Sequence, residues 1–346
     1  MKTLILWTDA FRKDYISKEN TPFLYKLSKK YGVGTLKPSF GFSQASWFSG
    51  VYPNKHGEFS VFNNSKNKIK TWALRLLPKS LRPTAFNLFR YLKGNDYVSH
   101  YVDIDQMGKF SLTREKYYHH KNALKVKTLF DFFNENEISY LLYYWPLIIE
   151  NGKTRLTPLV KGTDISKVKK FIKLVRKTNN DVYFFHTSEL DAYGHDCGPK
   201  SEKIKIKLRE QDFLIERVIK QFNLDKDNIL IWSDHGMVEV KGTINLEEIL
   251  PENERYSRLI ESTMAKLWFF DAEFKQKVLA DIKKVKHVHI LSKEEIKKLN
   301  IDFKNDENFE EIFLADSGYL ICPNVFQKQP IKGVHGYDYS QKGELA

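Results

Sequence analysis

A short stretch rich in aspartate, histidine and glycine, residues 191–199, constrains this chain more than any other part of it. It follows the apolar and aromatic residues 181–185, which are typical of a buried strand. Asp191 and His195 are four residues apart, so they can direct a carboxylate oxygen and an imidazole nitrogen at one metal ion. This spacing alone is weak evidence for a metal site. Two other segments of the chain strengthen the interpretation.

The same design recurs further along the chain. Residues 229–233 form a second apolar segment, and Asp234 and His235 follow it directly. A third place is His335, which has glycines close to it on both sides. Three separate segments therefore offer carboxylate or imidazole ligands, and the sequence predicts that they meet around bound metal.

Apolar segments alternate with amphipathic segments along most of the chain. We expect strands at residues 3–8, 33–38, 139–144, 182–187 and 229–233, and helices at residues 21–31, 43–50, 126–134, 165–177 and 201–222. This alternation is typical of an α/β fold in which a mostly parallel central sheet has helices on both faces. Function in such sheets lies beyond the carboxyl ends of the strands, and Asp9, Asp191 and Asp234 all fall at such ends.

Two insertions are expected to interrupt this α/β core, which comprises residues 1–62, 121–240 and 311–346. Residues 63–120 interleave aromatic and basic side chains, and prolines divide them into short helices. We expect this insertion to form a basic cap over the site, with binding to an anionic membrane surface as the alternative. Residues 241–310 are expected to form a smaller α+β unit.

The composition excludes several classes of protein. The two cysteines among the 346 residues make neither a disulfide framework nor a zinc-binding C-x-x-C motif. The apolar run at the start is too short for a signal peptide, and no run approaches the length of a membrane span. We therefore expect a cytoplasmic location, with a peripheral association with the membrane as the alternative. The formal net charge of +13 favours anionic partners, although lysines on solvated helix faces account for most of the excess.

Ser43 is a candidate nucleophile. Gly41 makes a turn before it, and residues 43–50 are expected to form a helix that ends at Gly50. A hydroxyl at a helix start could attack phosphorus while backbone amides hold the phosphoryl oxygens. A serine at such a position is most often only a helix cap, and the residue pattern alone leaves both interpretations open.

Taken together, the motifs resemble the alkaline phosphatase superfamily, and within it the type I phosphodiesterase/nucleotide pyrophosphatase branch. The resemblance rests on Asp9 and on residues 50–57, 191–199, 233–237 and 333–338, which occur in the order typical of the family. It implies a site for two divalent metal ions, usually zinc. In that site Asp191, His195 and His335 would hold one ion, and Asp9, Asp234 and His235 would hold the other. Manganese or iron would also suit these ligand sets.

The chain departs from the family at the nucleophile. The family usually places a threonine or serine about ten residues before the glycine that corresponds to Gly50, and that spacing falls on Phe40. Ser39 is one residue too early, and Ser43 is three too late. We favour Ser43 because it lies at a helix start just after a glycine turn, whereas Ser39 lies beside a proline at a strand end.

The resemblance also implies a contact to the substrate. In relatives, an asparagine downstream of the His-Gly pair supplies an amide to a phosphoryl oxygen. Asn63 or Asn64 could do so here, although the spacing does not match the family's closely.

The sequence therefore predicts a metal-dependent hydrolase of phosphoric esters that prefers phosphodiester or pyrophosphate bonds to monoesters. Two cations about 4 Å apart can stabilise the attacking and leaving oxygens of an in-line displacement. A serine nucleophile would pass through a phospho-enzyme intermediate. The expected partner is a phosphorylated small molecule, which could be a nucleotide, a sugar or a lipid head group. Nucleic acid is not expected as a partner, and the oligomeric state is left open.

The sequence leaves two alternatives to a hydrolase of phosphoric esters. One is a phosphotransferase or phosphomutase that acts on a sugar or lipid head group, which the basic aromatic insertion would suit. The other is a catalytically inert relative that binds anions or a membrane surface, which the irregular spacing of the nucleophile would suit.

Overall fold

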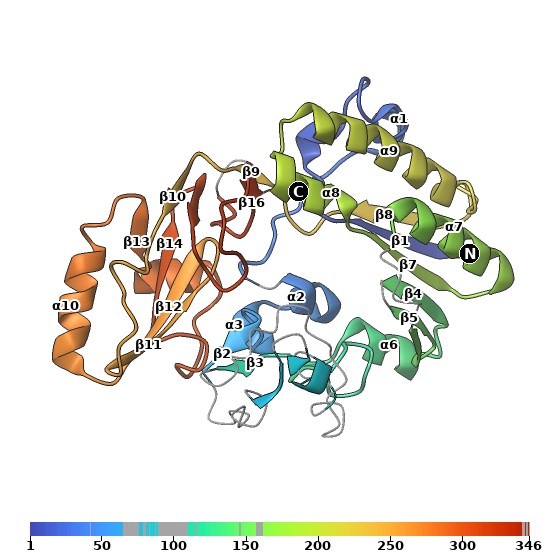
Figure 1. Ribbon diagram of the computed structural model, residues 1–346. Coiled ribbons are helices and arrows are strands. Elements are labelled where there is room, and N and C mark those ends of the chain that lie inside the picture. Colours follow the sequence, from blue (N-terminus) through green and yellow to red (C-terminus); the bar gives the residue numbers. More distant parts are fainter. Residues whose placement is uncertain are drawn as a thin grey trace.

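The computed structural model describes residues 1–41, 43–64, 76–78, 81–82, 84–86, 88, 110–114, 116–144, 147–156, 162–340, 343 and 345. Its largest element is a six-stranded sheet with the strand order β6-β5-β4-β7-β1-β8 (Figure 1). The bounds of these strands are β1 Thr3–Thr8, β4 Tyr140–Tyr144, β5 Leu147–Glu150, β6 Lys153–Leu156, β7 Val182–Thr187 and β8 Asn228–Trp232.

This sheet is mixed but mostly parallel, as the sequence predicts. β1 runs parallel to β7 and to β8, and β4 runs parallel to β7. β5 and β6 extend the sheet as an antiparallel hairpin that the sequence analysis missed. Its signal was the Asn151-Gly152 pair, because both residues have positive φ (47° and 78°) and a two-residue hairpin turn of this kind requires that conformation.

Helices pack on both faces of the six-stranded sheet, which confirms the predicted layers. One face is covered by α1 Pro22–Tyr31, α7 Asp164–Lys177 and α9 Glu202–Ile219, and the other by α2 Ser43–Ser49 and α6 Leu129–Glu135. The side chains of β7 alternate between the two faces. Tyr183 and Phe185 are buried under the first set of helices, whereas Val182 and Phe184 are buried under the second.

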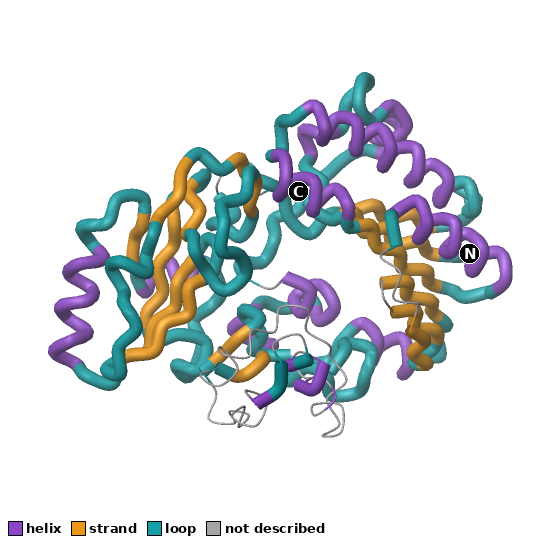
Figure 2. The backbone as a smooth tube through the Cα atoms, viewed as in Figure 1, coloured by secondary structure: helices purple, strands orange, loops and turns teal. Residues whose placement is uncertain are grey.

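A smaller antiparallel sheet, ordered β11-β12-β14-β13, lies at the other end of the molecule (Figures 1 and 2). Its elements are β11 Tyr256–Ile260, β12 Met264–Phe269, α10 Ala272–Ile282, β13 Val288–Ile290, α11 Lys293–Lys298 and β14 Glu311–Ala315. The sequence analysis assigned residues from 311 onward to the core. β14 nevertheless lies between β12 and β13, where its residues Ile312, Phe313 and Leu314 are buried.

Short elements connect and complete the two sheets. Three strand pairs are β2 Phe62–Asn63 with β3 Ser111–Leu112, β9 Val238–Glu239 with β16 Gly333–Val334, and β10 Gly242–Ile244 with β15 Tyr319–Ile321. The remaining helices are α3 Pro53–His56, α8 Glu189–Cys197 and a 3₁₀ turn at Lys13–Tyr15. Most of the expected cap insertion, residues 63–120, lies outside the described residues. Among the helices that the structure describes, none combines the length and apolar character needed to cross a membrane.

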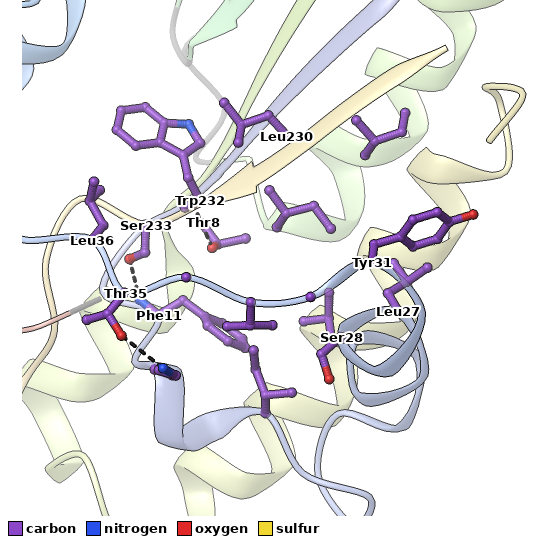
Figure 3. Close-up of a pocket in the computed structure, with 18 of the residues that line it drawn as sticks. Thr8, Phe11, Leu27, Ser28, Tyr31, Thr35, Leu36, Leu230, Trp232 and Ser233 are labelled. Atoms are coloured by element: carbon purple, nitrogen blue, oxygen red, sulfur yellow. Dashed lines mark hydrogen bonds between the residues drawn. The ribbon is translucent and has the colours of Figure 1, made fainter. Parts of the chain in front are cut away.

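Residues 33–38 do not form the strand that their sequence pattern predicts. They lie across a cavity of about 640 Å³ from β8, the edge strand of the six-stranded sheet (Figure 3). Val33 and Leu36 line this cavity from one side, and Leu230 and Trp232 line it from the other. The apolar residues of the segment therefore line a cavity, and its backbone does not join the sheet.

The start of α1 is held by a carboxylate from a distant helix. Asp212 of α9 is 3% exposed and accepts hydrogen bonds from the backbone amides of Phe23 (2.8 Å) and Leu24 (2.9 Å). These amides belong to the first helical turn, which has no acceptors of its own. Pro22 opens the helix without an amide that would need one. The predicted N-cap, Thr21, instead donates its hydroxyl to the Tyr15 carbonyl (2.9 Å).

We therefore expect Asp212→Ala to lower the free energy of unfolding by about 2–3 kcal/mol, because it leaves two amides of α1 without acceptors. Chemical denaturation followed by circular dichroism measures this. Asp225→Ala, at an exposed turn after α9, is the matched control and should change stability by less than about 0.5 kcal/mol. Equal effects of the two substitutions would show that Asp212 does not anchor α1.

Candidate metal centre

The carboxyl ends of three strands bring the candidate ligands together. β7, β1 and β8 are parallel neighbours in register, so their carboxyl ends lie level with one another. Asp9 follows β1 and Asp234 follows β8. α8 begins directly after β7 and carries Asp191 and His195 one helical turn apart. His335 follows β16, which packs against α8. The six ligands that the sequence predicts, these five and His235, thus come to one region.

The first cluster consists of Asp9, Asp234 and His235, whose ligand atoms all lie within 4.8 Å of one another. His235 Nε2 is 3.1 Å from Asp234 Oδ2 and 3.4 Å from Asp9 Oδ1. The other oxygen of Asp234 accepts a hydrogen bond from the amide of Ala10 (3.2 Å). Ala10 has a φ of 56°, so this bond holds a left-handed turn that directs Asp9 toward β8. The cluster has the composition that the resemblance implies.

The second cluster centres on Asp191. Its Oδ1 lies 3.4 Å from His195 Nε2 and 3.6 Å from His335 Nε2. Ligand atoms of Asp191, His335 and His235 also lie within 4.8 Å of one another. The rings of His235 and His335 stack with centroids 3.6 Å apart. His235 therefore belongs to both clusters, whereas the sequence analysis assigned it to one.

Backbone carbonyl groups orient two of the imidazoles. His195 Nδ1 is 2.9 Å from the Gly333 carbonyl oxygen, and His235 Nδ1 is 2.9 Å from the Gly236 carbonyl oxygen. A proton on each Nδ1 satisfies the carbonyl, so Nε2, which faces the carboxylates, is the nitrogen at which a metal ion can replace a proton. This is the arrangement that a metal-binding imidazole needs.

Close packing of α8 on β16 brings His335 to Asp191. A side chain at Gly333 would overlap the Gly194 carbonyl group, and one at Gly194 would lie 2.8 Å from Met237 Cε. The Lys332 amide also donates to the His195 carbonyl oxygen (2.9 Å). Glycine is therefore needed at position 333, where backbone atoms of α8 leave no room for a side chain, whereas a side chain at position 194 would require Met237 to move.

The buried charges of the two clusters shift the acidities of their members. Burial and the nearby Asp234 and Asp191 carboxylates raise the pKa of Asp9 well above its ordinary value. Burial opposes charge on Asp234 and on His235, but their mutual attraction outweighs it. The pKa of Asp234 is consequently lowered to about 2, and the pKa of His235 is raised well above its ordinary value. Burial and the neighbouring His235 lower the pKa of His335 to about 3.

The donor atoms fit divalent metal ions. Asp191 Oδ1 is buried without a hydrogen-bond partner in the described part of the chain, although two imidazole nitrogens face it. Such an orphaned acceptor is costly to bury unless a cation satisfies it. Carboxylate oxygens together with imidazole nitrogens suit zinc, manganese or iron. In chemical terms, the two clusters can hold two cations that share the neighbourhood of His235.

His186 is a functional candidate that the sequence analysis missed. It lies in β7, is 7% exposed, and places Nε2 3.1 Å from Asp9 Oδ2. Its ring packs on Trp7 (centroids 3.9 Å apart) and on Tyr144 (4.9 Å). Because Asp9 Oδ1 faces His235, His186 can hold the second oxygen and thereby fix the orientation of the carboxylate. The available signal was a histidine in an apolar strand.

The candidate nucleophiles lie on opposite sides of Gly41. α2 begins at Ser43, as predicted, and Gly41 before it has a φ of 85°. Trp47, one turn further along α2, contacts the rings of Trp7 (5.0 Å) and Trp232 (4.3 Å). These two tryptophans stand two residues before Asp9 and Asp234, so α2 packs against the carboxyl ends of β1 and β8.

Ser39 lies in a different environment. It is buried, and its hydroxyl has no hydrogen-bond partner in the part of the chain that the structure describes. The adjacent Phe40 packs on Phe59 in an apolar core that also contains Met264 and Leu314 of the smaller sheet. Ser39 therefore stands at the junction with that sheet.

The proposed phosphoryl contacts, Asn63 and Asn64, lie at the β2–β3 strand pair. Asn63 pairs with Ser111 of β3, and the Asn64 amide donates to the Glu307 carbonyl oxygen (2.7 Å). A contact of either with a phosphoryl oxygen stays a prediction.

Comparison with known proteins gives consistent matches. The family model described as type I phosphodiesterase/nucleotide pyrophosphatase matches residues 3–338. An uncharacterised pyrophosphatase/phosphodiesterase of Schizosaccharomyces pombe is 24% identical over 239 residues, which cover 68% of this chain. The matched part is 44% of that relative, so this chain spans less than half of its length.

Solved structures of ectonucleotide pyrophosphatase/phosphodiesterase 5 share the fold over 100% of this chain. The murine protein has a TM-score of 0.70 at 19% identity, with 87% of its chain covered. Its inactive threonine-to-alanine variant in complex with AMP has a TM-score of 0.70 at 20% identity and 86% coverage. The human protein has a TM-score of 0.70 at 18% identity and 86% coverage.

We expect His186→Phe to weaken zinc binding by about tenfold to a hundredfold, because the aromatic ring is kept but Asp9 loses the group that orients it. Competition with a zinc-binding chromophore measures the affinity, and circular dichroism checks the fold. The control is His289→Phe, at an exposed position on β13. Unchanged zinc affinity in His186→Phe would show that Asp9 needs no such support.

Proposed function

Because this chain belongs to the type I phosphodiesterase/nucleotide pyrophosphatase family, we propose that it hydrolyses phosphodiester or pyrophosphate bonds at a two-metal centre. One observation carries the proposal: ligand side chains from distant segments meet in two clusters that share His235. The ligands proposed are Asp9, Asp191, His195, Asp234, His235 and His335.

The two clusters would have complementary roles. Cations bound there, for which zinc is our proposal, would polarise the phosphoryl group and stabilise charge on the attacking and leaving oxygens. The chain itself supplies the fixed geometry. His186 would hold Asp9, the Gly333 and Gly236 carbonyl groups would hold His195 and His235, and the close contact of α8 with β16 would place His335.

Ser43 is the proposed nucleophile. Its support is the packing of α2 against the ends of β1 and β8 through Trp47. Its hydroxyl oxygen would form a bond to phosphorus while the bond from phosphorus to the leaving oxygen breaks and the leaving group takes up a proton. Water would then attack the phosphoserine, the bond between Ser43 and phosphorus would break, and the serine would regain its proton. Ser39 is the alternative nucleophile.

A nucleotide is the substrate that the available observations favour. The murine structure with AMP belongs to a relative with the same fold, and AMP carries one of the phosphoryl groups that a nucleotide diester or pyrophosphate would present. The formal net charge of +13 favours an anionic substrate in general terms. We propose that the substrate is a nucleotide-like ester. The second group bonded to the phosphate is left open.

The first test compares two chromogenic esters. The protein should hydrolyse bis(p-nitrophenyl) phosphate faster than p-nitrophenyl phosphate, and treatment with a chelator should abolish both activities until zinc or manganese is restored. Release of p-nitrophenol measures turnover. Turnover that persists after metal removal, or no turnover of any phosphoric ester, would contradict the proposal.

The second test separates the two serines. Ser43→Ala should lower kcat/KM by about 10³-fold or more, which is the scale expected for loss of a nucleophile. Ser39→Ala should leave the chemical step intact. Metal content should stay equal in both variants, so that a loss of activity reports on the hydroxyl. The opposite pattern would transfer the role to Ser39.

A further inference from the structure

A concave basic surface lies between two helices on the outer side of the six-stranded sheet. We call it the basic groove, and it has a volume of about 530 Å³. α7 and α9 lie next to each other (Figure 1). Residues of both helices line the groove. Its cationic lining residues come from both helices: Lys169, Lys173, Arg176, Lys177, Arg217 and Lys220. The other lining residues are Ile172 and Gln221, so no carboxylate lines the groove.

The basic groove is at the opposite edge of the sheet from the candidate metal centre. Arg176, Lys177, Arg217 and Lys220 lie at the C-terminal ends of α7 and α9, which lead toward the first residues of β7 and β8. Five of the six candidate metal ligands instead follow the last residues of β1, β7 and β8, and His335 follows β16. The strands between these two edges span about 17–20 Å. A molecule in the groove therefore does not occupy the metal centre.

The usual preference for basic residues at the C-terminal end of a helix explains only part of the positive charge of the groove. Basic residues in the last turn of a helix stabilise its C-terminal end, which accounts for Arg176 and Lys177. It does not account for Lys169 and Lys173, which are exposed in the middle part of α7. Lys169, Lys173 and Lys177 are spaced four residues apart, and like charges at this spacing destabilise a helix.

Most of the positive charge is also not balanced within the described residues. Lys220 pairs with Glu216 (2.9 Å), and Arg176 donates to the neutral Gln221 (2.9 Å). No carboxylate pairs with Lys169, Lys173 or Lys177 anywhere in the described ranges. The groove thus concentrates repulsive cations that a bound anion would stabilise.

We propose that the basic groove binds a soluble small molecule that carries two or more clustered phosphate groups. Its volume lies within the range of about 300–1,000 Å³ that is typical of small-molecule sites. Lysine ammonium groups act as point charges toward phosphate, and arginine can bind it with two parallel hydrogen bonds. Because the groove is remote from the metal centre, this binding is separate from the proposed catalysis.

The surroundings of the groove favour a soluble ligand over a membrane surface. The six cations of the groove gather around one concave surface of about 530 Å³ between α7 and α9, rather than along an extended face. A concave surface of this size suits a compact anion better than it suits the plane of a bilayer.

Isothermal titration calorimetry with tripolyphosphate tests the proposal. The protein should bind it, and the triple variant Lys169→Gln, Lys173→Gln and Lys177→Gln should bind at least about tenfold more weakly, because three charge-assisted contacts are lost. Glutamine keeps the helical propensity of lysine, so the fold should be retained, and circular dichroism checks this. The matched control removes three exposed lysines of the other unit: Lys277→Gln, Lys286→Gln and Lys293→Gln.

One further variant tests whether tripolyphosphate binds at the groove or at the metal centre, and further probes test which class of ligand the protein binds. Asp191→Asn, which alters the metal centre, should keep full affinity for tripolyphosphate in metal-free buffer. Equal loss in the two triple variants would reduce the effect to net charge and overturn the proposal, and so would binding that depends on Asp191. Binding only to vesicles with 30% phosphatidylserine, or only to a single-stranded RNA, would overturn it in favour of a membrane or a nucleic acid. None of these outcomes depends on whether the chain hydrolyses phosphoric esters.

Discussion

Parallel pairing of β7, β1 and β8 in one register is the constraint on which the candidate centre depends. It places the three carboxyl ends side by side, so the residues that follow them converge. Polar contacts continue the alignment beyond the sheet: the Asp9 amide donates to the Thr187 carbonyl oxygen (3.1 Å), and the Phe11 amide donates to the Ser233 hydroxyl (2.8 Å). A slip of one residue would turn every side chain of a strand to the other face of the sheet. The apolar cores on both faces prevent such a slip.

The ends of the strands can be predicted from the sequence because they depend on residues that are adjacent in the chain. An apolar segment that stops at an aspartate beside a histidine indicates both a strand and a ligand, and Asp234 with His235 was found in this way. The helix layers followed from amphipathic spacing and proline and cap positions, as with Pro22 at the start of α1. Local sequence patterns do not predict contacts between residues that are far apart in the sequence. The position of His335 beside Asp191 depends on the packing of α8 on β16, which no local pattern encodes.

The errors have similar causes. The sequence predicts a strand at residues 33–38, but strand formation needs a partner backbone, and here a cavity separates the segment from β8. A single histidine in an apolar strand is most often a packed core residue, so the sequence of β7 does not by itself single out His186. The functional interpretation depends on the pairing of β1 with β7, which brings His186 to Asp9. The Asn151-Gly152 turn is different, because it is a local signal for a hairpin that the sequence itself contains.

The tryptophans around α2 have a consequence for observing the molecule. Trp47 meets Trp7 edge-on (83° between ring planes) and lies within 4.3 Å of the Trp232 ring centroid, so three indoles from three elements form one group. Coupled indoles this close give strong near-ultraviolet dichroism and quench one another's emission. Each is four residues or fewer from Ser43, Asp9 or Asp234. The chain thus contains an intrinsic optical probe, and a small displacement of α2 relative to β1 and β8 would register in its spectrum without any added label.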